Sequence, residues 1–182
     1  MKITFLGAGS TVFARNVLGD CLLSDLKDYE IALYDIDEHR LNESYVIITA
    51  MRDKYNKSVA VNKYTDPKKA FKGANYIINA IQVGGYKPCT VTDFEIPKKY
   101  GLKQTIADTL GIGGIFRALR TIPVMKNYAN IMEEVCPDVL FLNYTNPMSM
   151  LSGYMQRYTG VKTVGLCHSV QVCSENLLKS LG

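Results

Sequence analysis

The sequence has no tryptophan, only six prolines, and no apolar run long enough to cross a membrane. It also lacks a Cys-x-x-Cys pair, and its five cysteines are an odd number, which argues against a disulfide scaffold and favours a reducing compartment. Lysine plus arginine number 21 against 17 aspartate plus glutamate, without the basic stripe of a nucleic-acid binder. No signal-peptide pattern follows Met1. We therefore expect a cytoplasmic protein with no nucleic-acid or membrane partner.

What is present is globular composition over 182 residues, with 47% apolar and 21% charged residues. Short apolar runs alternate with longer helical stretches, which is typical of an α/β fold with a parallel sheet. We expect a Rossmann-type doubly wound sheet of strand order 3-2-1-4-5-6, with helices on both faces. The predicted strands are Lys2–Leu6, Glu30–Tyr34, Val59–Lys63, Tyr76–Ile81, Val139–Asn143 and Lys162–Leu166. The predicted helices are Thr11–Ser24, Glu38–Asn56, a short one from Pro67, Gly114–Val135, Pro147–Tyr158 and Ser169–Leu181. Asp66 is expected to cap the short helix and Gly182 to form the C-terminal cap of the last one.

The segment after the first strand carries a glycine pattern that suits a dinucleotide phosphate. Gly7 and Gly9 match the first two glycines of Gly-x-Gly-x-x-Gly, and Ser10 opens the following helix, but Val12 stands at the third glycine position. Asp35 ends the second strand, where an acid accepts hydrogen bonds from the ribose of NAD. With no adjacent arginine, this pattern favours NAD over NADP. Asp37 is expected to cap the next helix.

Further polar residues follow the later strands, at the edge of the sheet where ligands bind. Gly84 and Gly85 form either a loop that approaches a ligand closely or an ordinary flexible turn. Asn146 either binds substrate hydroxyls or caps the helix that Pro147 starts.

Cys167 and His168 pair a thiol ligand with an imidazole after the sixth strand. Taken alone, Cys167 is more simply read as a buried, inert thiol, and Cys173 does not complete a zinc pattern.

Asp108 precedes a glycine-rich helix entry, and it either supports a neighbouring base or occupies a plain turn. Arg117 and Arg120 lie on one helical face, where they contact a substrate, a subunit partner or, most commonly, only solvent.

Five segments, in this order, make the chain recognisable. ITFLGAGSTVF, LYDIDEHRL, QVGGYKPCTVTDFEIPKKYGLKQTIADTLGIGGIFRALRTIP, NYTNPM and GLCHSVQ closely resemble the NAD- and manganese-dependent glycoside hydrolases of family four. The resemblance implies hydrolysis through oxidation, elimination, addition and reduction instead of a pair of carboxylates. NAD takes hydride from the third carbon of the sugar, a base removes the proton from the second carbon, and a divalent metal stabilises the enediolate.

Carried onto this sequence, the resemblance makes Gly7, Gly9, Ser10 and Asp35 the NAD site. It makes Asn146 a substrate contact, Cys167 a manganese ligand, His168 the acid for the leaving group and Asp108 the support of the base. Phosphosugar members carry aspartate after the cysteine, so His168 implies an unphosphorylated α-galactoside as substrate.

The resemblance also implies that something is missing. The second metal ligand and the proton-abstracting base of the family have no counterpart in the chain. We therefore expect residues 1–182 to be the NAD-binding domain of an oligomeric enzyme whose catalytic half is absent here, and the chain alone to bind nucleotide at most. The alternatives are a family-four 6-phospho-α-glucosidase or α-glucosidase, a simple NAD-dependent hydroxy-acid dehydrogenase, and a nucleotide-sensing module without catalysis.

Overall fold

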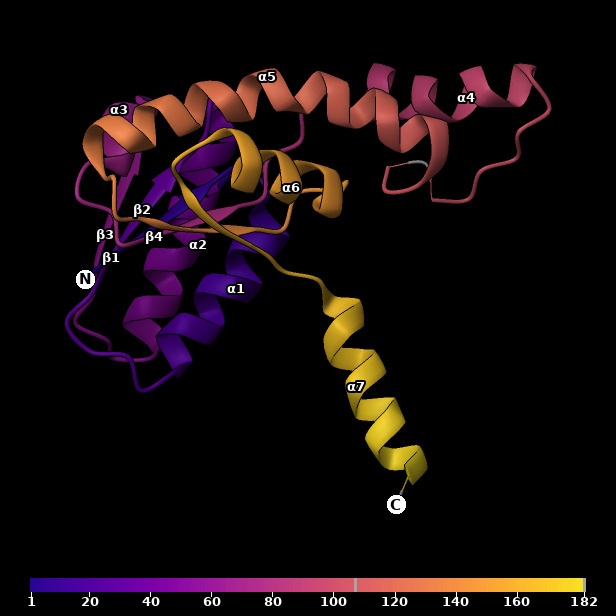
Figure 1. Ribbon diagram of the computed structural model, residues 1–182. Coiled ribbons are helices and arrows are strands. Elements are labelled where there is room, and N and C mark those ends of the chain that lie inside the picture. Colours follow the sequence, from indigo (N-terminus) through magenta and orange to yellow (C-terminus); the bar gives the residue numbers. More distant parts are fainter. Residues whose placement is uncertain (107, 182) are drawn as a thin grey trace.

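The structure is a computed structural model that describes residues 1–106 and 108–181, apart from the side chains of His168 and Gln171. Its centre is a parallel sheet of order β3-β2-β1-β4-β5-β6 (Figure 1), which confirms the predicted doubly wound topology. Each strand is short and the pairings are in register. The strands are β1 Lys2–Leu6, β2 Glu30–Tyr34, β3 Ala60–Tyr64, β4 Tyr76–Asn79, β5 Leu140–Asn143 and β6 Lys162–Gly165.

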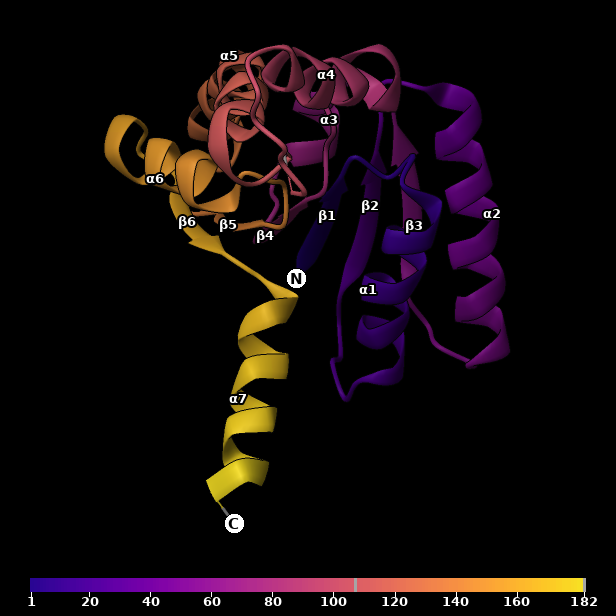
Figure 2. The ribbon, with the colours of Figure 1, turned by 90° about the vertical axis from the view of Figure 1, so that its right-hand side faces the viewer.

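Two layers of helices cover the sheet, one on each face (Figure 2). On one face α1 (Thr11–Leu23) and α2 (Glu38–Lys54) pack together over a core that includes Leu18 and Ile48. On the other face lie α3 (Pro67–Phe71), α5 (Gly111–Val135) and α6 (Met148–Tyr158). Burial on both faces explains why the central strands read as continuous apolar runs instead of alternating ones.

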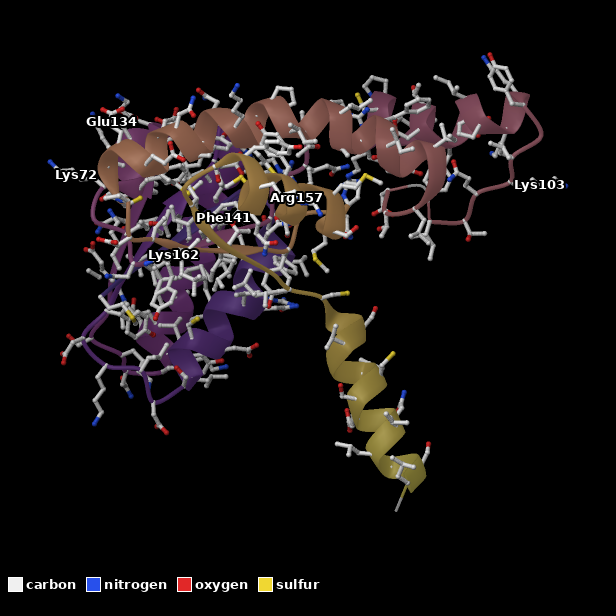
Figure 3. All side chains as sticks on the ribbon, in the orientation of Figure 1. Lys72, Lys103, Glu134, Phe141, Arg157 and Lys162 are labelled. Atoms are coloured by element: carbon white, nitrogen blue, oxygen red, sulfur yellow. The ribbon has the colours of Figure 1, made fainter. Side chains whose placement is uncertain are left out.

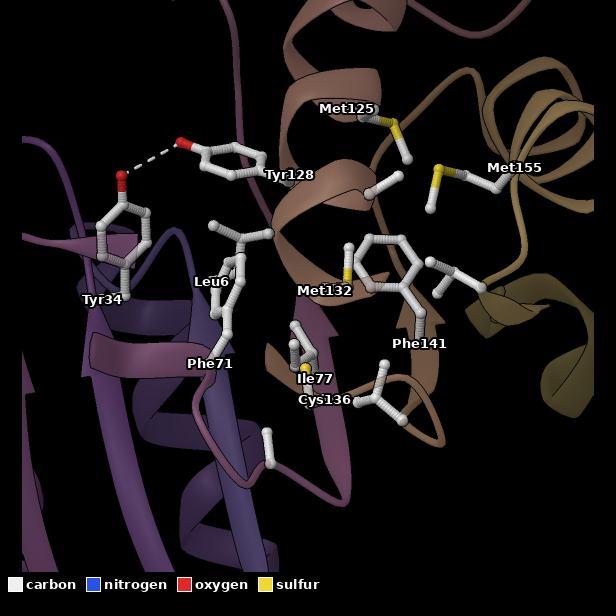
Figure 4. Close-up of a cluster of buried hydrophobic side chains, with 14 of the residues drawn as sticks. Leu6, Tyr34, Phe71, Ile77, Met125, Tyr128, Met132, Cys136, Phe141 and Met155 are labelled. Carbon is white, nitrogen blue, oxygen red and sulfur yellow. Dashed lines mark hydrogen bonds between the residues drawn. The ribbon is translucent and has the colours of Figure 1, made fainter. Parts of the chain in front are cut away.

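The second core lies under α5 and contains Tyr34, Phe71 and Tyr128 (Figure 4). The three rings meet edge to face, with centroids 5.8–5.9 Å apart. Phe141 on β5 packs into the same core and is 1% exposed. Aromatic pairs of this geometry contribute about 0.5–1.5 kcal/mol beyond the area they bury. The contacts among these three rings hold α5 against the carboxyl end of β2, where Tyr34 is the last residue.

Two predicted helix caps are confirmed. The Asp37 carboxylate accepts the Arg40 backbone N–H at 3.1 Å and begins α2. The Asp66 carboxylate accepts the Lys68 N–H at 2.9 Å, next to the proline that begins α3. Each cap stabilises its helix by about 0.5–2 kcal/mol.

The segment between β4 and α5 differs most from the prediction. The structure forms η1 (Gly85–Thr90), with an extended backbone at Lys87, and α4 (Val91–Lys99). No helix is predicted there, because Pro88 and Pro97 interrupt the helical pattern. Helix α5 also begins at Gly111 instead of Gly114. Figure 3 shows Lys103 at the far tip of the connection from α4 to α5.

Strand β4 ends at Asn79, two residues before the predicted Ile81, because the Asn79 side-chain oxygen takes the Ile81 N–H at 3.4 Å. The other strand and helix ends differ from the predicted ones by at most two residues.

Helix α7 (His168–Leu181) extends away from the sheet and from the other helices (Figures 1 and 2). Its described apolar side chains are exposed, and Leu177, Leu178 and Leu181 are 60, 69 and 75% accessible. The predicted cap at Gly182 lies outside the described residues. No helix within the described ranges combines the length and the apolar character that a membrane span requires.

Candidate functional site

A cleft of about 670 Å³ opens at the carboxyl ends of β1, β2, β4 and β5. This volume is within the range of small-molecule and cofactor sites, and the place is the switch point where the strand order reverses. The walls come from the glycine loop, the end of β2, the loop after β4, helix α5 and the loop after β5. The charged or strongly polar lining residues include Ser10, Asp35, Asp37, Arg40, Gln82, Arg117, Thr145 and Asn146.

Gly7 lets the first loop approach the neighbouring strand end. Its φ is +92°, and a Cβ at this position would lie 2.9 Å from the Ala80 carbonyl and the Ile81 nitrogen. The N–H groups of Gly7 and Ala8 both donate to the Tyr34 carbonyl, at 3.0 and 2.9 Å. Any side chain at Gly7 would therefore push the loop off β4 and disturb its anchor on β2.

Asp35 is held against this loop by two backbone hydrogen bonds. Its Oδ2 accepts the Gly9 N–H at 2.6 Å, and its Oδ1 accepts the Asp37 N–H at 2.9 Å. A Cβ on Gly9 would lie 2.7 Å from Oδ2, so only glycine permits the contact without a shift. Each oxygen retains a second lone pair, which leaves the carboxylate able to accept a ribose hydroxyl.

The start of α1 completes the geometry that a dinucleotide needs. Within the described residues, Ser10 makes no side-chain capping hydrogen bond and the first turn of α1 has no acidic residue, so no residue of α1 itself neutralises the positive end of its dipole, and the Asp35 carboxylate lies beside it at Gly9. Val12, at the position of the third glycine, is 65% exposed and therefore does not disturb the packing of α1 on the sheet. The residues present fit NAD.

The fold adds an arginine to the surroundings of the proposed nucleotide site. Arg40 lies five positions after Asp35 in the sequence, yet the first turn of α2 brings it into the lining of the same cleft. An arginine at the ribose end can accommodate a 2′-phosphate. The absence of an adjacent arginine therefore does not by itself select NAD over NADP.

A pair of buried amides, which was not predicted from the sequence, organises the loops after β4 and β5. The Asn79 side-chain nitrogen donates to the Asn143 side-chain oxygen at 2.8 Å, and both residues are fully buried. Asn143 in turn donates to the Thr145 carbonyl, and the Thr145 hydroxyl donates to the Ile81 carbonyl, each at 3.1 Å. The sequence feature that could have indicated this pair is an asparagine at the end of each of two apolar strands.

Asn146 lies where both alternatives left open by the sequence stay possible in space, beside the cleft and next to the start of α6. It lines the cleft, and its Oδ1 accepts the Met148 N–H at 3.3 Å near the start of α6. Its backbone carbonyl accepts a hydrogen bond from Arg117 Nε at 3.1 Å.

Asp108 is linked to the cleft through Arg117. A guanidinium nitrogen of Arg117 lies 3.8 Å from Asp108 Oδ2, and the two side chains are 12 and 37% exposed. Burial lowers the pKa of Arg117, and the nearby Asp108 carboxylate opposes that effect. The plain-turn interpretation of Asp108 is therefore incomplete, because its carboxylate faces a largely buried cation.

Arg120 is also paired, so the expectation of two solvated arginines is wrong. Its two terminal nitrogens donate to the carboxylate of Asp93 at 3.2 and 2.6 Å, and its Nε donates to the Val83 carbonyl at 3.1 Å. The bidentate hydrogen bonds raise the pKa of Arg120. This contact ties α4 and the loop after β4 to α5.

The proposed metal ligand is exposed, and the interpretation of Cys167 as a buried thiol is wrong. Hydrogen bonds from Ser169 lower the pKa of the Cys167 thiol. The His168 side chain lies outside the described residues. Among the described side chains, no three histidine, cysteine, aspartate or glutamate residues gather in a way that could hold a metal ion. The fold therefore brings Gly7, Gly9, Ser10, Asp35 and Asn146 to one cleft, whereas the side chains that the structure describes do not by themselves form a three-donor metal site around Cys167.

Two tyrosines on the cleft wall were not anticipated. The hydroxyls of Tyr34 and Tyr128 lie 3.3 Å apart in a hydrogen bond (Figure 4), and both residues line the cleft. Burial, followed by the Tyr34 hydrogen bond, raises the pKa of Tyr128. Nothing local in the sequence pairs residues on β2 and α5.

Comparison with known proteins gives a consistent result. Residues 2–182 match the family described as Family 4 glycosyl hydrolase. The chain is 67% identical over 182 residues to the alpha-galactosidase of Bacillus subtilis (strain 168), covering 100% of the chain and 42% of that protein. It is 39% identical over 183 residues to the alpha-galactosidase of Rhizobium meliloti (strain 1021), covering 100% of the chain and 37% of that protein.

A solved structure shows the same arrangement of elements. The 6-phospho-beta glucosidase from Thermotoga maritima, with manganese, NAD+ and glucose-6-phosphate, superposes with a TM-score of 0.84 at 26% identity, covering 100% of this chain and 43% of that one. The chain thus spans about two fifths of the length of the relatives it matches.

Proposed function

This chain belongs to the family 4 glycosyl hydrolases, and from that premise we propose that the protein containing it is an NAD-dependent α-galactosidase that also uses a divalent metal. The observation that carries the proposal is the 67% identity, over all 182 residues, to the alpha-galactosidase of Bacillus subtilis. Identity of this degree to a glycosidase supports a hydrolase over a simple hydroxy-acid dehydrogenase, which would share only the fold.

Residues 1–182 act as the NAD-binding domain in this proposal. Gly7 and Gly9 let the backbone approach the pyrophosphate, Ser10 presents the start of α1, and Asp35 accepts the ribose hydroxyls. NAD bound in the cleft would supply a hydride acceptor for a hydroxyl-bearing carbon of the sugar, and the ketone so formed would make the neighbouring C–H acidic. The backbone hydrogen bonds of Asp35 fix its carboxylate in advance, so little ordering remains to be done when the nucleotide binds.

The sugar is proposed to bind beside Asn146, at the end of the cleft where Arg117 also lines the wall. Asn146 contacts the sugar hydroxyls, Asp108 supports a base, and His168 donates a proton to the leaving group. Cys167 is proposed as a metal ligand, but the described residues provide no group of three donors around it. A complete metal site needs further ligands, and no chemical step is assigned to the metal from these residues.

The preferred substrate is an unphosphorylated α-galactoside, because His168 follows Cys167 where phosphosugar members carry aspartate. The full-length gene product is therefore expected to hydrolyse p-nitrophenyl α-galactoside when NAD and Mn²⁺ are present. The 6-phospho-α-glucoside, tested at the same concentration, distinguishes the alternative family-four activity. Preference for the phosphosugar would overturn the substrate assignment and leave the family intact.

The redox route has its own test. During turnover in D₂O the full-length protein should introduce deuterium at the second carbon of the released galactose, because that carbon loses its proton as the glycosidic bond breaks. Omission of NAD should abolish both hydrolysis and exchange. Hydrolysis that continues without NAD and without exchange would contradict the mechanism.

The domain assignment is tested with the chain itself. A titration followed by NADH fluorescence should show saturable binding by residues 1–182, and the chain should show no measurable glycoside turnover. Turnover by the chain alone would contradict the proposal that it is only the nucleotide-binding part. We place the enzyme in the cytoplasm and in a homo-oligomer as part of the same proposal.

A further inference from the structure

We propose that Arg117 is a positioning residue that joins the loop of Asp108 to the loop of Asn146 and so fixes the sugar end of the cleft. The catalytic consequence of this inference rests on the proposed function, whereas its structural part does not. Arg117 comes from the second turn of α5, and the two loops it joins precede α5 and follow β5. One side chain thus bridges two segments that the sequence keeps apart.

The contacts of Arg117 differ on its two sides. Its Nε donates to the Asn146 carbonyl at 3.1 Å, which is a normal hydrogen bond. Its terminal nitrogen lies 3.8 Å from Asp108 Oδ2, which is an ion pair too long for a direct hydrogen bond. Arginine suits this place because its planar fork carries five donors that can serve a carbonyl, a carboxylate and a ligand at once.

The burial of Arg117 shows that it is more than a surface cation. Its side chain is 12% exposed, and the accessible part lines the cleft. Burial lowers its pKa although Asp108 and Asp93 act in the opposite direction. A largely buried charge is costly unless it is paired, and removing it leaves Asp108 and the Asn146 carbonyl without this partner.

The position of Arg117 is itself fixed by its helix. Three residues further on, Arg120 binds both oxygens of Asp93 and also the Val83 carbonyl, which anchors α5 to α4 and to the loop after β4. The Thr121 hydroxyl donates to the Arg117 carbonyl at 2.7 Å. Helix α5 therefore presents Arg117 from a rigid support, as a positioning group requires.

The structural part is tested by amide hydrogen exchange of the full-length gene product, with Arg117→Gln as the variant. Loss of the bridge should speed amide exchange at least tenfold in both segments. In the loop before α5 the amides to follow are Thr109 and Leu110, whose N–H groups donate to the Ile106 carbonyl. At the start of α6 it is Leu151, whose N–H donates to the Pro147 carbonyl. The matched control is Arg157→Gln, an exposed arginine at the end of α6 (Figure 3). Unchanged exchange in either segment would overturn the proposal, whether or not the protein is a galactosidase.

The catalytic part is tested by kinetics with the galactoside. Arg117→Gln should lower kcat by about 10- to 100-fold, the loss expected for a misplacement near 1 Å, while KM and the Kd for NADH change less than threefold. Arg117→Lys, which keeps the charge but loses the fork, should recover part of kcat. In an Asp108→Asn background, Arg117→Gln should lower kcat by less than a further threefold, because the two residues act together.

The outcomes separate the two proposals. A fully additive double variant, or a change confined to KM, would mean that Arg117 only contacts substrate and would overturn the positioning role. An inactive wild type would overturn the proposed function and leave the exchange experiment valid. If Arg117→Gln does not fold, Arg117→Lys must still speed exchange at Leu151, since lysine has no Nε–H for the Asn146 carbonyl; wild-type exchange there would overturn the bridge.

Discussion

At the scale of single residues, Asp35 combines a structural role with a proposed binding role. It accepts backbone N–H groups from Gly9 and Asp37, so it stabilises the glycine loop. Asp35 also lines the cleft. The residue proposed to bind the nucleotide ribose is therefore also one that shapes the site.

Replacement of Asp35 by alanine should weaken NADH binding by 10-fold or more. Hydrogen bonds to a charged group contribute about 1.5–3 kcal/mol, and each 1.4 kcal/mol is a factor of ten in affinity. A fluorescence titration of residues 1–182 with NADH measures the change. The control is Asp66→Ala, which removes the cap of α3 outside the cleft lining and lowers stability by about 0.5–2 kcal/mol but should leave affinity within threefold.

Arg40 allows a second prediction from the same titration. In Asp35→Ala the carboxylate is removed while Arg40 remains in the cleft lining to attract a 2′-phosphate, so the ratio of NADH affinity to NADPH affinity should fall. The double variant Asp35→Ala, Arg40→Gln should bind NADPH more weakly than Asp35→Ala does. An unchanged preference in the single variant would mean that Arg40 plays no part in selecting the nucleotide.

The pH dependence of stability has a contribution from Cys136, which is 6% exposed. Burial raises the pKa of its thiol to about 11 from the unfolded value of 9.0. Because the folded pKa is the higher one, the unfolded state holds fewer protons between these two values, so this contribution is complete below pH 9 and is lost as pH rises towards 11. Urea unfolding at pH 8 and pH 10.5 should therefore show a smaller fall in the free energy of unfolding for Cys136→Ala than for the wild type. An equal fall in both proteins would exclude the thiol as a source.

At the scale of elements, the short apolar runs were enough to predict the central strands, because a strand buried on both faces is apolar throughout. The outer strands β3 and β6 are partly exposed, and the strand order was predicted from the usual order of a doubly wound sheet. The glycine loop and Asp35 were predictable for a similar reason, since the loop and the acid that contacts it carry local signals. The helical segment of η1 and α4 was not, because its prolines obscure the pattern and its packing depends on Arg120 of another helix.

The same reason explains the other errors at the site. Arg117 and Arg120 look like surface arginines until the fold brings Asp108 and Asp93 beside them. Tyr34 and Tyr128 come from different elements and meet only in the folded core. Long-range pairing, which a single sequence does not display, decided the cases of the arginines and the tyrosines. Cys167 resembles a buried thiol in sequence, but it is exposed because it directly precedes α7, which extends away from the sheet.

The contact between α4 and α5 should have a measurable stability. Asp93 is 3% exposed and Arg120 is 25% exposed, so Asp93→Asn should lower the free energy of unfolding by about 1–3 kcal/mol, less than for a fully buried pair. Arg120→Met in the same chain should recover part of that loss by removing the unpaired cation. Urea denaturation gives both values. The comparison is Glu175→Gln, which breaks the exposed pair with Lys179 and should cost less than about 0.5 kcal/mol.

At the scale of the whole molecule, α7 leaves a stripe of apolar side chains without a protein neighbour within the described part of the chain. Val170, Leu177 and Leu181 lie on one face of the helix. The side chains of these three residues and of Val172 and Leu178 are 55–75% exposed. Apolar stripes of this kind promote association in water. The chain is therefore expected to self-associate through α7.

Sedimentation velocity of residues 1–182 should show a weight-average coefficient that increases with concentration. Leu177→Glu with Leu181→Glu should abolish the increase. The matched pair Asn176→Glu with Ser180→Glu adds the same charge to the same turns and should have a smaller effect. A concentration-independent wild type would mean that α7 does not mediate association in this chain.

The tyrosines around the cleft give the protein an optical property of its own. Tyr34, Tyr128 and Tyr144 line the site proposed for the nicotinamide dinucleotide, and the sequence contains no tryptophan to absorb their excitation or mask their emission. Tyrosine emission overlaps the absorption band of the reduced nicotinamide ring. Bound NADH would therefore act as an energy-transfer acceptor for these phenols, so that NADH emission excited through tyrosine absorption reports occupancy of the cleft.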